Sequence, residues 1–135
     1  MVATLIAATI ISLEADFVQT KYIALMDEPQ VSTGHMIYHA PDYLQWSYDH
    51  PQALVWEVDG SSSNVNPQVQ RLLRMIMASI SGDFTDNAKM QKESKKLFRS
   101  VNIIMDELTH VAQRVELVEK NGDTTIIEFK NVITK

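Results

Sequence analysis

The sequence contains no cysteine, and only four glycines and four prolines among its 135 residues. The lack of cysteine excludes disulfide frameworks, thiolate zinc sites and cysteine nucleophiles. With so few glycines, the chain has no Gly-rich loop of the kind that cradles phosphate groups. Positive charge is also scarce, since 12 Lys and Arg stand against 17 Asp and Glu and give a net charge of −5. That balance argues against a nucleic-acid-binding surface, which needs clustered Lys and Arg.

The N-terminal apolar run is short. Glu14 and Asp16 end it before the ~20 apolar residues that a membrane span requires. No Lys or Arg precedes it, as a secretory signal would demand, so an exported protein is expected to have lost its signal already. The spacing of its apolar residues predicts a short amphipathic helix, whose apolar side is formed by Val2, Leu5, Ile6 and Leu13.

The rest of the composition is that of one ordinary globular domain, with 45% hydrophobic and 21% charged residues. Alternating apolar residues predict strands over residues 13–22, 34–39, 43–48, 53–58, 98–105, 111–118 and 124–129. Asn66 and Pro67 begin a predicted helix that runs to Ile80, with Gly82 as its stop. The basic residues 89–99, which Glu93 interrupts, are predicted to be a solvated stretch.

Turn signals decide how these strands pair. Asn121-Gly122 predicts a tight hairpin, because both central positions of that turn favour a positive φ. Pro41-Asp42, Asp49-His-Pro51 and Asp59-Gly60 predict further short turns. Short turns favour antiparallel pairing. The sequence therefore predicts an α+β fold over residues 1–135, an antiparallel meander with helices on one face.

Large apolar side chains gather on two predicted neighbouring strands, where one face carries Leu44, Trp46, Tyr48, Leu54, Trp56 and Val58. The helix offers a matching stripe, formed by Val69, Leu72, Leu73, Ile76, Met77 and Ile80. Two interpretations fit this pattern. Either the two surfaces pack into a plain hydrophobic core, or the sheet curves away so that part of the surface lines a cavity for an apolar ligand. Periodicity does not separate them.

Catalytic and metal-binding patterns are lacking. No His-Glu-x-x-His or Gly-x-Ser-x-Gly pattern occurs. The histidines have no acidic partner at a metal-motif spacing, and they are His35, His39, His50 and His110. A carboxylate pair for acid–base chemistry must converge across a cleft, whereas the aspartates occupy strand or turn positions that suit solvent or capping, namely Asp16, Asp42, Asp59 and Asp123. The sequence predicts no enzyme, no metal and no cofactor.

The stretch Leu13-Glu-Ala-Asp-Phe-Val-Gln-Thr-Lys21 resembles the opening strand of the outer-membrane lipoprotein carrier proteins, the LolA family. The similarity continues through a Gly-led strand, a Pro turn, a hydrophobic-x-Trp-x-aromatic strand, a Pro and an Asp-Gly. These features are Gly34, Pro41-Asp42, Leu44-Gln-Trp-Ser-Tyr48, Pro51 and Asp59-Gly60. Residues 115–131 are similar to the late hairpin of that family.

This resemblance implies a curved antiparallel sheet, an open half-barrel, with helices covering its concave face as a lid over an apolar cavity. It implies a monomeric periplasmic carrier that takes acylated lipoproteins from an inner-membrane exporter and passes them towards an outer-membrane acceptor, without metal or cofactor. The acyl-chain cavity is then expected to comprise Phe17, Leu44, Trp46, Tyr48, Leu54 and Trp56. The lid helix is expected to present Leu72, Leu73, Ile76 and Met77.

The sequence departs from the family at two points. Ala40 stands just before the turn proline, where well-studied members have an Arg that bonds the lid. The chain is also shorter than usual, because the segments after Gly60 and before Phe98 are too brief for the family's additional strands. Two other functions stay open. One is a lipid- or lipoprotein-sensing adaptor domain with a similar half-barrel, and the other is a hydrolase or isomerase with a His and a carboxylate in its pocket.

Overall fold

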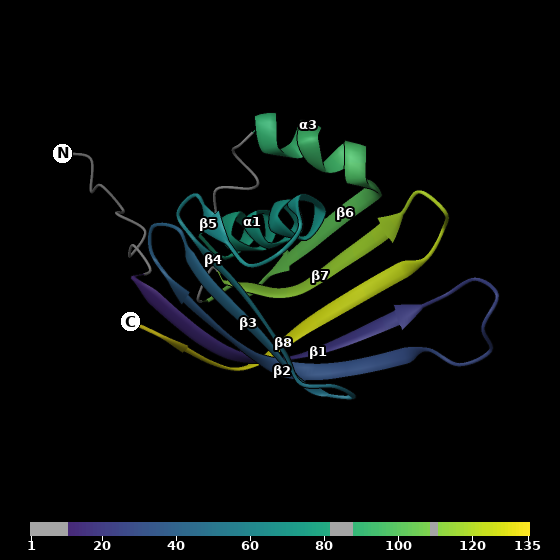
Figure 1. Ribbon diagram of the computed structural model, residues 1–135, viewed down its shortest axis with the longest axis horizontal. Coiled ribbons are helices and arrows are strands. Elements are labelled where there is room, and N and C mark those ends of the chain that lie inside the picture. The colour runs from purple at the N-terminus through teal and green to yellow at the C-terminus, as the bar shows by residue number, and fades with distance from the viewer. Residues whose placement is uncertain (1–10, 82–87, 109–110) are drawn as a thin grey trace.

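The structure is a computed structural model that describes residues 11–81, 88–108 and 111–135. Eight strands and two helices follow one another along this part of the chain (Figure 1). They are β1 (Ser12–Tyr22), β2 (Gln30–His39), β3 (Tyr43–His50), β4 (Leu54–Asp59), β5 (Ser62–Ser63), α1 (Pro67–Ser81), α3 (Ala88–Leu97), β6 (Phe98–Met105), β7 (Ala112–Glu119) and β8 (Thr124–Thr134). The N-terminal helix predicted for Val2 to Ile6, the stop at Gly82 and His110 lie outside the described residues. Leu13 belongs to β1.

All eight strands form one antiparallel sheet in the order β5-β4-β3-β2-β1-β8-β7-β6. The sheet is curved and open, with β5 and β6 at its two edges (Figure 1). This confirms the curved antiparallel sheet predicted from the sequence. The single meander was wrong, because β1–β5 and β6–β8 are two meanders joined by pairing of β1 with β8. The helical segment carries the chain from the β5 edge to the β6 edge.

The two faces of the sheet differ because side chains alternate along each strand. On β1, Leu13, Ala15 and Phe17 are buried, whereas Glu14 between them is exposed. On β3, Leu44 and Trp46 are buried on the same side. We call this side the inner face and the opposite side the outer face. The inner face and α1 share one hydrophobic core.

Helix α1 begins as the sequence predicts. The Asn66 side chain accepts a hydrogen bond from the Val69 backbone N–H at 2.9 Å, which caps the first turn. The helix packs against the inner face through its apolar stripe, and Leu73, Ile76 and Ile80 are at most 1% exposed. The guanidinium of Arg74 donates to the Gly60 carbonyl, so the helix is also tied to the turn after β4.

Some local features differ from the prediction. The basic stretch, predicted as solvated, keeps Lys92, Lys95 and Lys96 exposed but also forms helix α3, whose Leu97 packs against the core. Strand β2 begins at Gln30 instead of residue 34, and β8 continues to Thr134. In the β7–β8 turn only Gly122 has a positive φ, of 95°, and its N–H donates to the Glu119 carbonyl. The turn is therefore not the two-residue type with a positive φ at both positions.

Candidate functional site

A pocket of about 300 Å³ opens between the first turns of α1, the junction of α3 with β6, and the inner face. Its apolar lining consists of Trp56, Val69, Leu72, Leu97, Phe98, Leu117 and Ile127. Its polar lining consists of Gln19, Lys21, Tyr48, Gln68, Glu119 and Thr125. The volume lies at the lower end of the range for small-molecule sites, which are mostly apolar with a few placed polar groups.

The two linings occupy different ends of the same strands. On β1 the inner face changes from the buried Phe17 to the polar Gln19 and Lys21. On β7 it changes from Leu117 to Glu119, and on the antiparallel strand β8 it changes from Ile127 to Thr125. Because these strands are neighbours in the order β1-β8-β7, their polar ends meet at one end of the sheet. The pocket therefore has an apolar floor beneath α1 and a polar rim, which we call the mouth.

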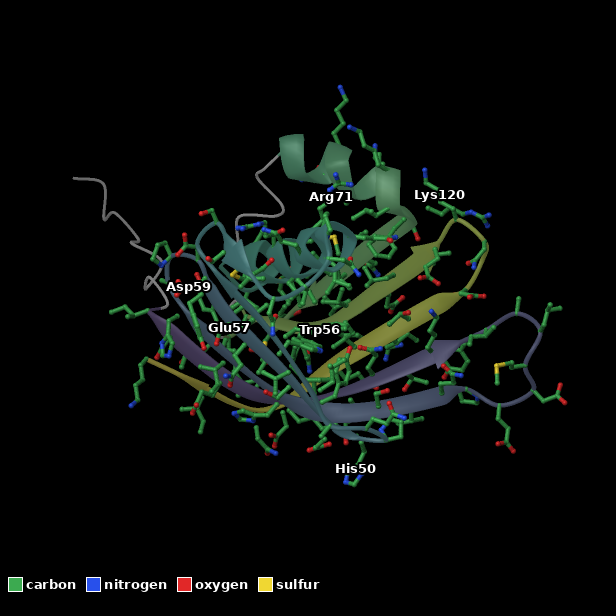
Figure 2. All side chains as sticks on the ribbon, viewed as in Figure 1. His50, Trp56, Glu57, Asp59, Arg71 and Lys120 are labelled. Carbon is green, nitrogen blue, oxygen red and sulfur yellow. The ribbon has the colours of Figure 1, made fainter. Side chains whose placement is uncertain are left out.

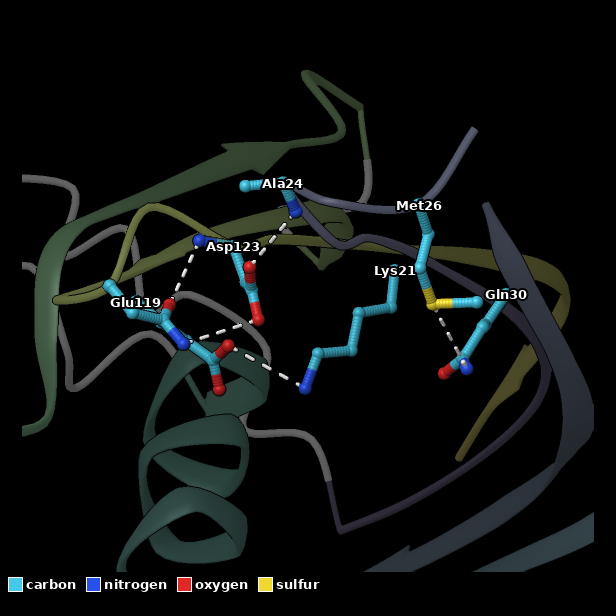
Figure 3. A network of polar contacts seen from close by, with 7 residues as sticks. Lys21, Ala24, Met26, Gln30, Glu119 and Asp123 are labelled. Atoms are coloured by element: carbon cyan, nitrogen blue, oxygen red, sulfur yellow. Dashed lines mark hydrogen bonds and ion pairs between the residues drawn. The ribbon is translucent and has the colours of Figure 1, made fainter. Parts of the chain in front are cut away.

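An ion pair spans the mouth. Lys21 Nζ lies 3.5 Å from Glu119 Oε2, and each side chain is about one-third exposed, at 33% and 32% (Figure 3). The neighbouring turns are linked by Asp123, whose Oδ1 accepts a hydrogen bond from the Ala24 N–H at 3.2 Å. Asp123 is buried and also accepts a hydrogen bond from the Asn121 amide. These contacts hold the β1–β2 and β7–β8 connections beside each other at the pocket.

Aromatic rings line the wall of the pocket on the β3–β4 side. Tyr48 and Trp56 meet edge to face, with ring centroids 5.3 Å apart, and Trp56 lies beneath α1 (Figure 2). The Tyr48 hydroxyl donates to Gln19 Oε1 at 2.8 Å, which connects this wall to the mouth. Burial raises the pKa of the Tyr48 hydroxyl above its ordinary value, so the group is an uncharged hydrogen-bonding group at neutral pH.

The structure distributes the residues of the predicted cavity among three environments. Tyr48 and Trp56 line the pocket. Phe17, Leu44 and Trp46 are at most 1% exposed and form the core below it. Leu54 is 47% exposed and lies outside the pocket lining.

The exposure of Leu54 follows from its place in the sheet, since β5 pairs only with Val58 and Asp59. At Leu54, β4 is therefore an edge strand.

The predicted lid residues divide in the same way. Leu72 lines the pocket, whereas Leu73, Ile76 and Met77 are buried in the core. The second half of α1 is buried on every side, because each residue from Met75 to Ile80 is buried. Only the first turns of the helix face the pocket.

Sequence reasoning missed most of the mouth. Gln19 and Lys21 continue the alternation of β1, so the strand pattern alone could have assigned them to the inner face. Glu119 and Thr125 join them only through the β1–β8 pairing, in which Lys21 is the partner of Thr125. No local sequence pattern predicts the pairing of β1 with β8, because the two strands are separated by almost the whole chain.

Ionisable groups also occur outside this pocket, and Arg114, Glu128 and Lys130 line a second pocket of about 400 Å³ on β7 and β8. On the outer face His35 Nδ1 lies 2.9 Å from Asp16 Oδ1, and both side chains are about half exposed. Across residues 11–81, 88–108 and 111–135, no three His, Asp or Glu side chains gather closely enough to hold a metal ion. In the same ranges, neither helix has the length and hydropathy needed to span a bilayer.

No known family model matches the sequence, and no curated protein matches it significantly. Among solved structures, the chain is similar to a DUF1329 family protein from Desulfovibrio piger, with a TM-score of 0.37 and 9% sequence identity. The similarity covers 96% of this chain and 88% of that protein.

Proposed function

We propose that the protein is a non-enzymatic carrier that binds an acyl chain of a lipoprotein in the pocket between α1 and the sheet. The observation that carries this proposal is the pocket itself, an open space of about 300 Å³ with an apolar floor and a polar mouth. An apolar chain with a polar head matches that division. Removing one methylene group from water stabilises a complex by ~0.8 kcal/mol, so a partly enclosed chain binds usefully.

The sequence resemblance to lipoprotein carriers supports the rest of the proposal. On this resemblance we propose that the protein acts in the periplasm, with acylated lipoproteins as cargo, an inner-membrane exporter as donor and an outer-membrane acceptor. The carrier would act as a monomer, without metal or cofactor. These partners and this location are proposed on the resemblance, whereas acyl-chain binding is also argued from the lining of the pocket.

The volume of the pocket limits how much of an acyl chain is held at one time. A methylene group takes up about the same space as a water molecule in the liquid, roughly 30 Å³. The pocket therefore accommodates on the order of ten methylene groups, which is part of one acyl chain. Additional chains require the space under the helix to widen.

Helix α1 is proposed to be the lid over the concave face. Its second half is fixed by burial, and its first half, with Gln68, Val69 and Leu72, borders the opening. Arg74 donates a hydrogen bond to the Gly60 carbonyl between these two halves. This bond ties the helix to the sheet in a chain that has Ala40 where the carriers have their latch Arg. Widening would therefore begin at the first turns of α1.

The direct test is binding of a diacylated peptide, compared with the same peptide without acyl groups. We expect the acylated peptide to bind and to change the fluorescence of Trp56, one of two tryptophans and the one that lines the pocket. A second step follows transfer of the bound peptide to phospholipid vesicles. Equal binding of the acylated and unacylated peptides, or no binding by the folded protein, would rule the proposal out.

Matched variants locate the binding. Leu72→Ala and Trp56→Ala remove apolar lining and are expected to weaken binding, by up to about tenfold for a few lost methylene contacts. Leu54→Ala is the control, because Leu54 is on the same strand as Trp56 but outside the pocket. If Leu54→Ala weakens binding as much as Trp56→Ala, the acyl chain lies elsewhere on the sheet.

One observation favours the adaptor alternative. Apolar side chains are exposed around the β1–β2 connection, with Leu25 98%, Met26 51% and Val31 51% exposed. An exposed apolar surface of this kind suits contact with a protein partner. An adaptor would use this surface without passing on lipid, so retention of acylated peptide in the vesicle transfer step would favour it over a carrier.

A further inference from the structure

The mouth of the pocket carries opposite charges that balance. Lys21 and Glu119 face each other at 3.5 Å, and among the described residues they are the only charged ones in the pocket lining. The remaining polar groups of the lining are the amides of Gln19 and Gln68 and the hydroxyls of Tyr48 and Thr125. A ligand head in this position therefore meets hydrogen-bond donors and acceptors but no net charge.

Two of these polar groups are available to a ligand. Within the described part of the chain, the side chains of Gln68 and Thr125 make no hydrogen bond, although Gln19 is engaged by Tyr48. Gln68 lies on α1 and Thr125 on β8, so they approach the mouth from the helix and from the sheet. An amide and a hydroxyl serve ester, amide and hydroxyl groups as both donors and acceptors.

We propose that the pocket selects acyl chains whose head is uncharged and carries ester, amide or hydroxyl groups, and discriminates against free fatty acids. This inference rests on the proposed acyl-chain binding and specifies its ligand class. The chemistry that fits is that of an acylglycerol ester or an acylated amine. Lys21 and the Gln68 amide donate to carbonyl oxygens of such a head, and Glu119 accepts from its hydroxyl or N–H.

A carboxylate head gains much less binding free energy at the same place. Lys21 attracts it, but Glu119 at 3.5 Å from Lys21 repels it at almost the same distance. The two Coulomb terms nearly cancel, while the carboxylate still loses part of its hydration on entering the mouth. To use Lys21 fully, the carboxylate must displace Glu119 and leave that residue unpaired. The balanced pair therefore works against anionic heads and leaves uncharged heads unaffected.

The test compares two ligands of equal chain length, a saturated fatty acid and its glycerol monoester, as competitors of a fluorescent acyl probe. The unaltered protein is expected to bind the monoester more tightly, on the order of fivefold or more, which is the scale of a partly exposed charge interaction. Glu119→Gln gives the mouth a positive charge and should strengthen fatty-acid binding about fivefold with little change for the monoester. Lys21→Gln should weaken fatty-acid binding by a similar factor.

The exchanged pair Lys21→Glu with Glu119→Lys is the matched control, since it keeps both charges and the neutral sum. It should restore the preference for the monoester. The inference is overturned if the unaltered protein binds the fatty acid as tightly as the monoester, or if the single changes shift both ligands equally. Failure of both ligands to displace a bound probe, or to bind at all, instead overturns the proposed acyl pocket. The two failures are thus distinguishable.

Discussion

The ring of Phe17 on β1 stacks on the indole of Trp46 on β3, with centroids 4.0 Å apart and planes 20° apart. Strand β2 runs between these two strands. The rings meet because the β2 residue opposite Phe17 is Gly34, which has no side chain to separate them. A Cβ at Gly34 would overlap the Phe17 ring and the Ser47 carbonyl oxygen. The floor of the pocket therefore rests on an aromatic stack that a glycine permits.

Removing the Phe17 ring should destabilise the fold strongly. Phe17 is 1% exposed, and Phe→Ala changes in cores typically cost about 3–5 kcal/mol. We expect Phe17→Ala to lower the urea midpoint by an amount corresponding to that range, and Phe17→Leu to cost less because it leaves a smaller cavity. A loss for Phe17→Ala below about 1 kcal/mol would show that the stack is not part of the stable core.

The variant Gly34→Ala, which adds a single methyl group, should also destabilise the fold. The Ser47 carbonyl belongs to the backbone of the paired strand and cannot swing aside, so β2 and β3 must separate or Phe17 must leave its stack. Overpacking of this kind costs about 1–3 kcal/mol or more. Ser32→Ala on the same strand is the control and should change the free energy of unfolding by less than about 0.5 kcal/mol. Equal midpoints for the two variants would contradict the close approach.

The strands were predictable from sequence wherever one face is buried. Leu44 and Trp46 alternate with Gln45 and Ser47, and the structure places them on opposite faces. The same rule failed to find α3, because its sequence is dominated by polar and charged side chains; among its described side chains, Leu97 at its end packs against the core. Helix α3 runs directly into β6 at Phe98, an attachment that the sequence pattern does not reveal.

The site was predictable only in part, because alternation along a strand assigns a side chain to a face but does not show what packs against it. Alternation identified the correct face for Trp46 and Trp56, which are partners on β3 and β4. It could not tell which of the two indoles faces an opening. That is decided by Phe17 and by Phe129, which contact Trp46 from strands β1 and β8. Trp56 has neither contact and lines the pocket.

Alkaline pH should destabilise the protein through Tyr48. Burial raises the pKa of its hydroxyl above the ordinary value of 10.0, so the folded protein holds this proton more tightly than the unfolded chain does. The stabilisation is complete below about pH 10 and is lost as the pH rises through the folded pKa.

Urea midpoints measured against pH should therefore fall above about pH 10, and the fall should be shallower in Tyr48→Phe. Tyr43→Phe is a useful comparison, since burial and then the hydrogen bond to Glu57 raise the pKa of Tyr43 as well. Identical alkaline slopes in Tyr48→Phe and the unaltered protein would contradict the role of Tyr48.

Acidic pH should destabilise the protein through Asp16 on the outer face. The Asn131 amide donates to this carboxylate, His35 contacts its other oxygen, and these hydrogen bonds lower the pKa of Asp16 below 3.8. A lowered folded pKa means that the stabilisation is present above about pH 4 and is lost as the pH falls through the folded pKa. Because Asp16 is half exposed, the effect should be small.

The measurement is the urea midpoint below about pH 4 in the unaltered protein and in Asp16→Asn. The variant should lose stability at neutral pH and show a weaker dependence on acid. Asn131→Ala should weaken the acid dependence more than His35→Gln does, since the Asn131 hydrogen bond is the larger cause of the pKa shift. The reverse order would place the main contact at His35.

The volume of the pocket predicts a limit on acyl-chain length. With each buried methylene worth ~0.8 kcal/mol, affinity should rise about fourfold per carbon along a series of saturated acyl monoesters. A pocket of about 300 Å³ is filled by on the order of ten methylene groups, so the rise should flatten near that length. Leu72→Ala enlarges the pocket and should move the plateau to longer chains at lower affinity. Val69→Phe fills it from the helix side and should move the plateau to shorter chains. An affinity that rises in equal steps far beyond ten carbons would mean that the chain does not end in this pocket, and that α1 opens to a larger cavity when lipid enters.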